Sequence, residues 1–210
     1  MRLIKNYRKY YNSIWYVLRH LKTCVHNYFL IRKYPFLKPS DAFGEPVEKY
    51  HYQYVELVHM PIGWERAFGK MFCDDLLEAC KTDDVDPHDL RITEMKEKWG
   101  QLKVSVNQCT PNIQRVLDDY EQVSGNICWR CGKIDVPMTN FGWLLPECRK
   151  CYVENYNNNS LQYDDMMRGM SKEDCRIPDY YTTHVFYKDS DQYVNHDLTW
   201  ITNRLRGIYK

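Results

Sequence analysis

The segment CWRCGKIDVPMTNFGWLLPECRKC, residues 128–151, carries four cysteines in two pairs with the spacing C-x2-C-x16-C-x2-C. The two sulfurs of such a pair can turn toward one centre, and two pairs supply the tetrahedral thiolate set that zinc favours. We therefore predict one zinc ion held by Cys128, Cys131, Cys148 and Cys151. An iron–sulfur cluster and a redox-active pair are the alternatives, and the redox pair lacks the βαβ context that it needs.

The predicted zinc ion should be structural. Four thiolates leave no coordination position for water, so we expect no catalysis at the metal. Gly132 follows the first pair, where glycine permits a positive φ that turns backbone N–H groups toward the sulfurs. Four cations flank the pairs and can offset the negative charge of the zinc tetrathiolate: Arg130, Lys133, Arg149 and Lys150. Loss of the metal should unfold this region, because metal binding and folding are coupled.

The residues around the cysteines indicate an order of elements over about 128–158. A short hairpin should turn near Asn140 and Gly142, and a helix should carry the second pair in its first turn. This arrangement resembles a treble-clef zinc finger, with a spacing close to the GATA type. The resemblance implies a scaffold or a DNA-binding module. Nucleases of the HNH type share the finger but need histidines beside it, and none lies between His88 and His184.

The composition is that of a globular protein. The 210 residues are 44% apolar and 27% charged, which fits one domain with appendages or two small domains. No apolar run reaches the roughly 18 residues of a transmembrane helix, and no apolar stretch stands clear of the N-terminal charges as in a signal peptide. Nine cysteines, an odd number with four in a metal pattern, favour a reducing compartment, and we expect the cytoplasm of a host cell.

Residues 1–40 predict a basic helical arm. They contain nine Lys or Arg and no Asp or Glu, whereas the other 170 residues carry 20 basic and 28 acidic side chains. Apolar residues recur three and four apart from Ile4 to Tyr28, which predicts an amphipathic helix over 3–29 that ends before Pro35. Lys5, Arg8, Lys9, Arg19 and Lys22 lie off this seam. The arm can pack on the body or a second copy, bind nucleic acid, or lie on a membrane or partner surface.

Residues 41–127 predict a small α+β core. A strand or aromatic patch should run from Tyr50 to Leu57, and a helix should cover 64–81. A hairpin over 90–106 should turn at Gly100, with a bulge or twist between Thr93 and Trp99. The next helix should begin at Thr110 as N-cap and end at Gly125.

The fold class that we expect is α+β: a helix–hairpin–helix core with a treble-clef zinc finger at 128–160, a basic N-terminal helical arm and a C-terminal extension. The extension, 161–210, should contain a helix near 161–170, a strand at 180–187 and a helix near 197–208 with Leu198, Ile201 and Leu205 on one stripe.

The stretch TEMKEKWG, residues 93–100, offers a second candidate site. A Glu-x-Lys pattern such as Glu94 with Lys96 occurs on a strand of PD-(D/E)xK nucleases, where an upstream carboxylate completes a metal site. Asp84, Asp86 and Asp89 are the upstream carboxylates here. The simpler interpretation is a solvated face or contact surface with Lys96 and Lys98 exposed.

Other metal-capable or reactive residues give weaker patterns. His184, His196 and Cys175 fit no common metal spacing. Cys24, Cys73, Cys80 and Cys109 should be small buried residues.

Four segments together resemble an uncharacterised family of phage-encoded proteins: IRKYPFL at 31–37, MPIGWERAFG at 60–69, KEKWGQL at 96–102, and the cysteine segment. In that family a Lys-Glu-Lys-aromatic-Gly hairpin and a four-cysteine finger recur in this order. The resemblance spans about residues 30–152 and implies an origin rather than an activity. Small accessory phage proteins often bind host components, including defence nucleases.

We expect a non-enzymatic, zinc-stabilised phage accessory protein that binds a host protein or nucleoprotein complex, with anti-CRISPR-like inhibition of a defence nuclease as one form. Direct DNA or RNA binding and a metal-dependent nuclease are the alternatives. A homo-oligomer through the N-terminal helix is a further expectation, and an integral membrane protein is not. The expected contact residues are Lys5, Arg8, Lys9, Arg19, Lys22, Lys96, Lys98, Arg130, Lys133, Arg149 and Lys150.

Overall fold

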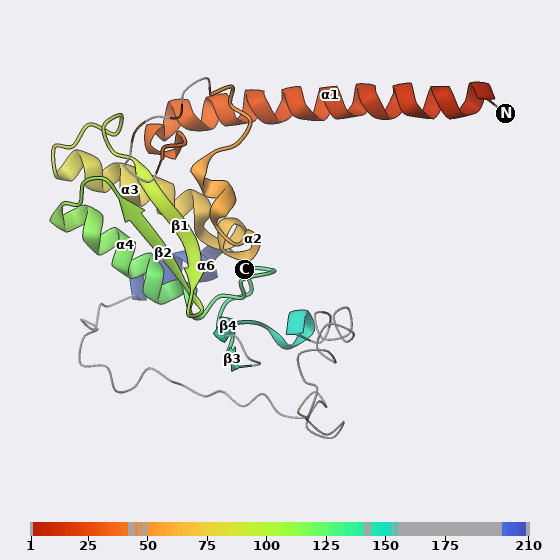
Figure 1. The fold of residues 1–210 in the computed structure, drawn as a ribbon. Helices are drawn as coiled ribbons and strands as arrows, with labels where there is room; N and C mark the ends of the chain where they lie inside the picture. The colour runs from red at the N-terminus through yellow and green to blue at the C-terminus, as the bar shows by residue number, and fades with distance from the viewer. Residues whose placement is uncertain are drawn as a thin grey trace. The chain divides into compact units, whose positions relative to one another are not determined.

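A computed structural model of the chain combines α-helices with two small β-sheets, which confirms the α+β class (Figure 1). It describes residues 2–41, 45, 47, 50–140, 144–152, 154 and 199–208. The expected helix at 161–170, the expected strand at 180–187 and Leu198 of the expected final helix lie outside these residues. Of the described helices, none has both the length and the apolar composition needed to cross a bilayer.

The chain divides into two compact units, each assembled from separate stretches of sequence. The first comprises Met1–His59, Cys73–Met95 and Val104–Gln114. The second comprises Met60–Phe72, Lys96–Lys103 and Arg115–Lys210. Elements such as α3 and the first β-sheet therefore contribute residues to both units.

The first unit begins with the long helix α1, Arg2–Lys33, followed by the short 3-10 helix η1, Pro35–Leu37. The helix stops where Pro35 requires, since Tyr34 before it has an extended φ of −128°. Buried Tyr34 donates a hydrogen bond to Asp74 Oδ1 at 2.5 Å, and Lys33 Nζ lies 3.0 Å from the same oxygen. Burial raises the pKa of Tyr34, and so does the hydrogen bond to Asp74.

An aromatic patch occupies 50–54, and the strand that was the other expectation for this region does not form. Tyr52 has a φ of 58°, which is incompatible with an extended strand. Its ring meets Tyr28 of α1 and Tyr50 edge to face, at centroid distances of 5.3 and 5.2 Å. The 3-10 helix η2, Glu56–His59, follows.

The helix predicted over 64–81 is found in three consecutive parts: α2, Ile62–Trp64; a π-helical turn η3, Glu65–Gly69; and α3, Lys70–Thr82. Its apolar face is buried as the periodicity predicts, with Phe68, Phe72, Leu76 and Cys80 all at most 1% exposed. The structure differs from the predicted continuous helix by the π-helical turn, which no residue of the segment predicts.

Strands β1, Ile92–Lys98, and β2, Gln101–Val106, form the first sheet. The two residues between them, Trp99 and Gly100, both have positive φ, 56° and 78°. Positive φ at both positions is the signature of a type I′ turn, whose twist matches that of paired strands. Along β1 the buried positions are Ile92 and Met95, so strict alternation fails within the stretch where the sequence predicted a bulge or twist.

Helix α4, Pro111–Ser124, starts and stops where expected, but its first turn is capped from another loop. Asn112 N–H donates to Asp83 Oδ2 at 3.0 Å, and the Thr110 hydroxyl donates to the same oxygen. Thr110 therefore stands at the predicted N-cap position, but the acceptor of the Asn112 N–H is the Asp83 carboxylate. A carboxylate is a stronger acceptor than a hydroxyl and also interacts favourably with the positive end of the helix.

The second unit has its own aromatic core. The Tyr120 ring lies 5.3 Å from the rings of both Phe68 and Phe72. Trp64 is fully buried, and its indole N–H donates to the Ile127 carbonyl at 2.7 Å. Such a buried indole combines large apolar contact with one satisfied donor.

The second sheet pairs β3, Met138–Asn140, with β4, Leu144–Pro146, in antiparallel register, Met138 opposite Pro146. Helix α6, Thr199–Ile208, matches the predicted final helix: Ile201 and Leu205 are buried, and Arg206 lies 3.4 Å from Asp135.

Two of the four cysteines expected to be buried are not. Cys73 and Cys80 are buried, and burial raises the pKa of Cys80 to about 11. Cys109 is exposed in the loop before α4, and Cys24 is half-buried on α1 beside His20. Neither position faces a packed interior, so the prediction of burial from the apolar character of cysteine is wrong at these two residues.

Candidate metal centre

The first cysteine pair lies in a tight loop that begins after Ile127. Cys128 N–H donates to the Lys133 carbonyl at 2.8 Å, and Gly132 N–H donates to the Cys128 carbonyl at 2.9 Å. Gly132 has the positive φ that its position predicted, 82°. These bonds fold the loop back so that Cys128 and Cys131 come from its two sides.

The second pair follows β4 and enters a helical turn over 149–152. Tyr152 N–H donates to the Cys148 carbonyl at 2.9 Å, which places Cys148 at the start of that turn. Trp129 N–H donates to the Pro146 carbonyl at 3.0 Å, so the end of β4 is fastened directly to the first loop. The two pairs, 17 residues apart from Cys131 to Cys148, are thereby brought together.

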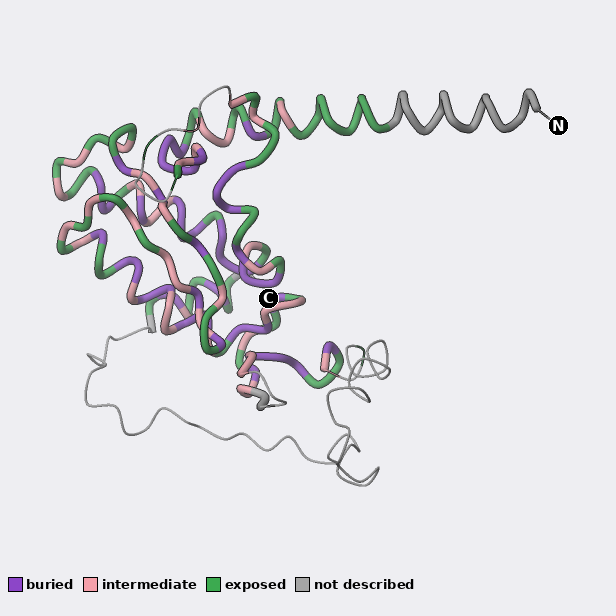
Figure 2. Tube along the Cα trace, viewed as in Figure 1, coloured by how far each residue is buried: buried purple, intermediate pink, exposed green. Residues whose placement is uncertain are grey.

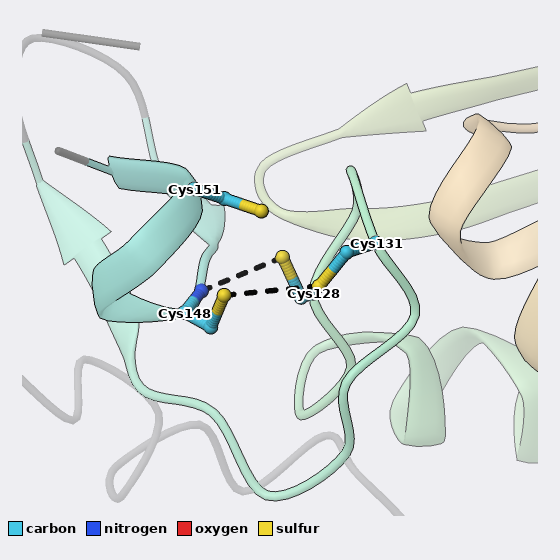
Figure 3. Close-up of side chains that lie close together, drawn as sticks. All are labelled: Cys128, Cys131, Cys148 and Cys151. Atoms are coloured by element: carbon cyan, nitrogen blue, oxygen red, sulfur yellow. Dashed lines mark hydrogen bonds between the residues drawn. The ribbon is translucent and has the colours of Figure 1, made fainter. Parts of the chain in front are cut away.

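The four sulfurs form one group, with all Sγ atoms within 4.8 Å of one another (Figure 3). Cys131 Sγ and Cys148 Sγ are 3.7 Å apart. A tetrahedron with metal–sulfur bonds of about 2.3 Å has sulfur–sulfur edges of roughly 3.8 Å, so this distance fits a shared metal ion. Among the described residues this is the one group of three or more metal-capable side chains that comes together in this way. The four cysteines could therefore hold a metal ion.

The surroundings of the sulfurs shift the cysteine pKa values in different directions. Burial raises the pKa of Cys128 and of Cys151, which disfavours the thiolate at both positions. At Cys131 burial acts in the same direction, but hydrogen bonds from Lys133 N–H and from the neighbouring thiols outweigh it and lower the pKa. Cys148 N–H also donates to Cys128 Sγ at 3.4 Å. A bound dication would favour the thiolate at all four residues.

A second contribution comes from Gly63, in α2. Gly63 N–H donates to the Trp129 carbonyl at 2.8 Å. A Cβ at Gly63 would collide with the Cys128 carbonyl oxygen and the Trp129 backbone, and a Cβ at Gly132 would lie 2.7 Å from the Gly63 carbonyl. The loop that carries the first pair therefore lies against α2 at a backbone distance that only two glycines permit. The sequence pattern did not single out Gly63, and its place between Ile62 and Trp64 at a helix start was the available signal.

The Arg130 side chain contacts residues at the second cysteine pair. Its Nη1 lies 3.4 Å from the Cys151 carbonyl and 3.8 Å from Glu147 Oε1. Glu147 is 2% exposed; burial raises its pKa, and the Arg130 charge acts in the opposite direction. Arg130 therefore links the two cysteine pairs while its side chain stays 33% exposed.

The other predicted cations lie at the surface. Lys133, Arg149 and Lys150 are exposed, and Lys150 lies 4.0 Å from Glu154 one turn on. Lys96 and Lys98 are exposed on β1, and Arg19 and Lys22 on α1. Side chains of Lys5, Arg8 and Lys9 fall outside the described set, as do Cys175, His184 and His196.

The carboxylates that the nuclease hypothesis requires do not form a metal-binding group among the described residues. Glu94 is exposed on β1, and in the described part of the chain it forms no ligand group with Asp84, Asp86 or Asp89.

Trp99 is a surface residue that the sequence did not single out. It is 61% exposed at the β1–β2 turn, with the positive φ given above. Positive φ is rare for bulky residues and costs free energy. The turn packs closely against β3 and β4: a Cβ at Gly100 would lie 2.5 Å from Met138 Sδ and 3.2 Å from the Leu144 carbonyl. The tip of the first sheet therefore lies against the second sheet, and the exposed indole is held there.

Comparison of the chain with protein-family models, curated proteins and solved structures finds no match.

Proposed function

We propose that this chain is a non-enzymatic binding protein stabilised by one zinc ion at Cys128, Cys131, Cys148 and Cys151. The observation that carries the proposal is the closed group of four sulfurs. Zinc is the metal that four thiolates at tetrahedral spacing favour, and full thiolate ligation leaves no position for a reacting water. The loop, short antiparallel sheet and helical turn that carry the cysteines support a treble-clef finger as the finer description.

The contacts around the cysteines support a scaffold role for the metal. Gly63 joins α2 to the first pair, Trp129 joins the first loop to β4, and Arg130 joins the first loop to the second pair. A metal ion in this place would tie together segments that are distant in sequence. Its binding free energy would then contribute to folding.

The exposed β1–β2 turn supports the proposal that the protein binds a partner. Trp99 is exposed in a costly conformation, and tryptophan is strongly enriched among residues that dominate binding energy. Lys96 and Lys98 are exposed on the adjoining strand. We propose that this turn contacts a protein or nucleoprotein partner in the cytoplasm. The resemblance to phage-encoded proteins favours a host component, including a defence nuclease.

Direct nucleic-acid binding is the second candidate, because Lys133, Arg149 and Lys150 are exposed beside the cysteines. Such binding would weaken steeply with salt, since each phosphate contact releases counterions.

The test is affinity capture from a host lysate, with and without nuclease treatment, for the wild type, Trp99→Asn and a Lys133→Ala/Arg149→Ala/Lys150→Ala variant. Asparagine tolerates positive φ, so Trp99→Asn should raise the free energy of unfolding by about 0.5–1 kcal/mol. Capture should nevertheless fall at least about tenfold, because a central tryptophan contributes about 2 kcal/mol or more.

Each outcome assigns a surface. Nuclease-resistant capture that Trp99→Asn removes supports the protein partner. Capture that nuclease treatment and the triple variant both remove supports nucleic acid. Capture of the same species by all three proteins would show that neither surface is the contact.

A further inference from the structure

Helix α1 exposes a row of large apolar side chains. Val17, Leu18, Leu21, Val25 and Phe29 are each more than half exposed. At 3.6 residues per turn these five positions fall within an arc of roughly 120° on the helix. None of the described side chains from Tyr16 to His26 is buried, as Figure 2 shows along this part of the tube. The row is therefore a continuous apolar face that its own unit does not cover.

The rest of this helix surface is polar and basic. Arg19, Thr23, His26 and Asn27 lie on the other side of the wheel, and Lys22 borders the apolar arc, where its stem can cover apolar surface while the ammonium reaches water. No acidic residue occurs anywhere in α1. The sequence continues the same apolar spacing back to Ile4 and the same excess of Lys and Arg back to Arg2.

The end of α1 is fixed to the first unit. Asn27 is 5% exposed, and its Nδ2 donates to the Tyr52 carbonyl at 2.9 Å. The Tyr28 ring packs on Tyr52, and Lys33 pairs with Asp74. The apolar face therefore belongs to a helix whose C-terminal part is packed on the rest of its unit.

Two requirements select the occupant: apolar material for the face and negative charge for its flanks. A second copy supplies apolar surface but brings an equally basic helix, and like charges at neighbouring positions repel. Duplex nucleic acid supplies negative charge but no apolar medium. An anionic lipid surface supplies both, and interfacial helices combine a Lys/Arg-rich face with an aromatic and aliphatic face.

We infer that α1 is a peripheral membrane-binding helix that lies in the interface of an anionic lipid surface. Leu18, Leu21, Val25 and Phe29 enter the boundary between headgroups and acyl chains, and Arg19 and Lys22 reach lipid phosphates. The inference does not depend on the proposed function, because it concerns the first unit and needs no metal.

The experiment is flotation of the full-length, zinc-loaded protein with vesicles. Vesicles of phosphatidylcholine with about 30% phosphatidylserine are compared with phosphatidylcholine alone, since anionic lipid supplies the attraction. The protein should float with the first vesicles and much less with the second. Added salt at about 0.5 M should weaken binding, because at that ionic strength charges are screened beyond a few ångströms. Arg19→Gln/Lys22→Gln should reduce the partition coefficient about fivefold for each charge removed.

The decisive variant is Leu21→Asn/Val25→Asn, matched by Tyr16→Asn. Tyr16 is 72% exposed but lies outside the apolar arc, so its replacement removes apolar surface from the wrong side. The double variant should lose at least about tenfold in partition coefficient, because two buried aliphatic anchors are removed, whereas Tyr16→Asn should bind like the wild type. Unchanged circular dichroism and zinc content show that the variants fold.

Three results overturn the inference. The first is no flotation with phosphatidylserine vesicles at low salt, whether or not sedimentation shows a dimer. The second is undiminished flotation of Leu21→Asn/Val25→Asn. The third is binding to a DNA or RNA duplex that Arg19→Gln/Lys22→Gln removes, in a protein that does not float.

Discussion

At the scale of single residues, two glycines set the approach of α2 to the first cysteine loop. Gly63 leaves room for the backbone of Cys128 and Trp129, and Gly132 leaves room for the Gly63 carbonyl. A Cβ on either glycine would collide with carbonyl oxygens of the backbone rather than with movable side chains. The position of the first cysteine pair therefore depends on Gly63, which supplies no ligand atom. A residue of this kind is invisible to a search for ligand spacing.

Gly63→Ala tests this dependence. The backbone must shift around the new methyl group, so the free energy of unfolding should fall by about 1–3 kcal/mol and zinc affinity should fall with it. Gly207→Ala is the matched control, because nothing lies within 4 Å of its Cβ position in α6, and alanine should raise stability by about 0.5–1 kcal/mol. Denaturation at saturating zinc and competition for zinc with a chromophoric chelator measure both effects. A Gly63→Ala protein as stable and as tightly metallated as the wild type would refute the close packing.

At the scale of elements, the start of α4 is held by a carboxylate from the loop after α3. The pKa of Asp83 is lowered below its ordinary 3.8, first by the Thr110 hydroxyl and then by Asn112, since both hydrogen bonds favour the charged form. A carboxyl with a depressed folded pKa stabilises the fold above its unfolded pKa. That contribution disappears as the pH falls through the folded value.

The expected pH dependence follows from this sign. At pH 6 Asp83→Asn should unfold at a lower temperature than the wild type, and the gap should narrow below pH 3.8 as the wild-type carboxyl takes up its proton. Asp84→Asn removes a charge from the next position, which is exposed, and the asparagine tolerates its φ of 55°. Thermal unfolding of the three proteins at pH 6, 4.5 and 3 shows whether the charge of Asp83 stabilises the fold. A gap that is constant across this range would mean that Asp83 caps α4 without its charge.

Elements were predictable where the sequence repeats a physical pattern. The apolar spacing located α1, α3 and α6, and Gly132 showed where positive φ was needed. The sequence left the outcome open where a distant residue decides it. Thr110 takes the predicted N-cap position, but the side chain that accepts the Asn112 N–H is Asp83, 27 residues before Thr110. For Tyr50 to Leu57 the pattern allowed a strand or an aromatic patch, and packing of Tyr52 against Tyr28 of α1 gave the patch.

At the scale of the whole molecule, the chain is assembled from interleaved segments. Each compact unit contains three separate stretches of sequence, so its boundaries depend on contacts between distant residues and not on local composition. Charge is also segregated along the chain: residues 1–40 contain nine basic residues and no acidic residue, and most of that segment is one helix. The cysteine centre was predictable in advance because its spacing is local within each pair, whereas its packing on α2 was not.

Zinc K-edge X-ray absorption of the purified full-length protein tests whether the four cysteines form a closed zinc tetrathiolate that stabilises the fold. The spectrum should show zinc with four sulfur neighbours at about 2.3 Å and no oxygen or nitrogen in the first coordination shell, and the protein should contain one zinc ion per chain. Nitrogen or oxygen ligands beside the sulfurs would show an open or mixed site. A protein that purifies without zinc, yet unfolds at the same temperature before and after zinc is added, would contradict a stabilising zinc tetrathiolate outright.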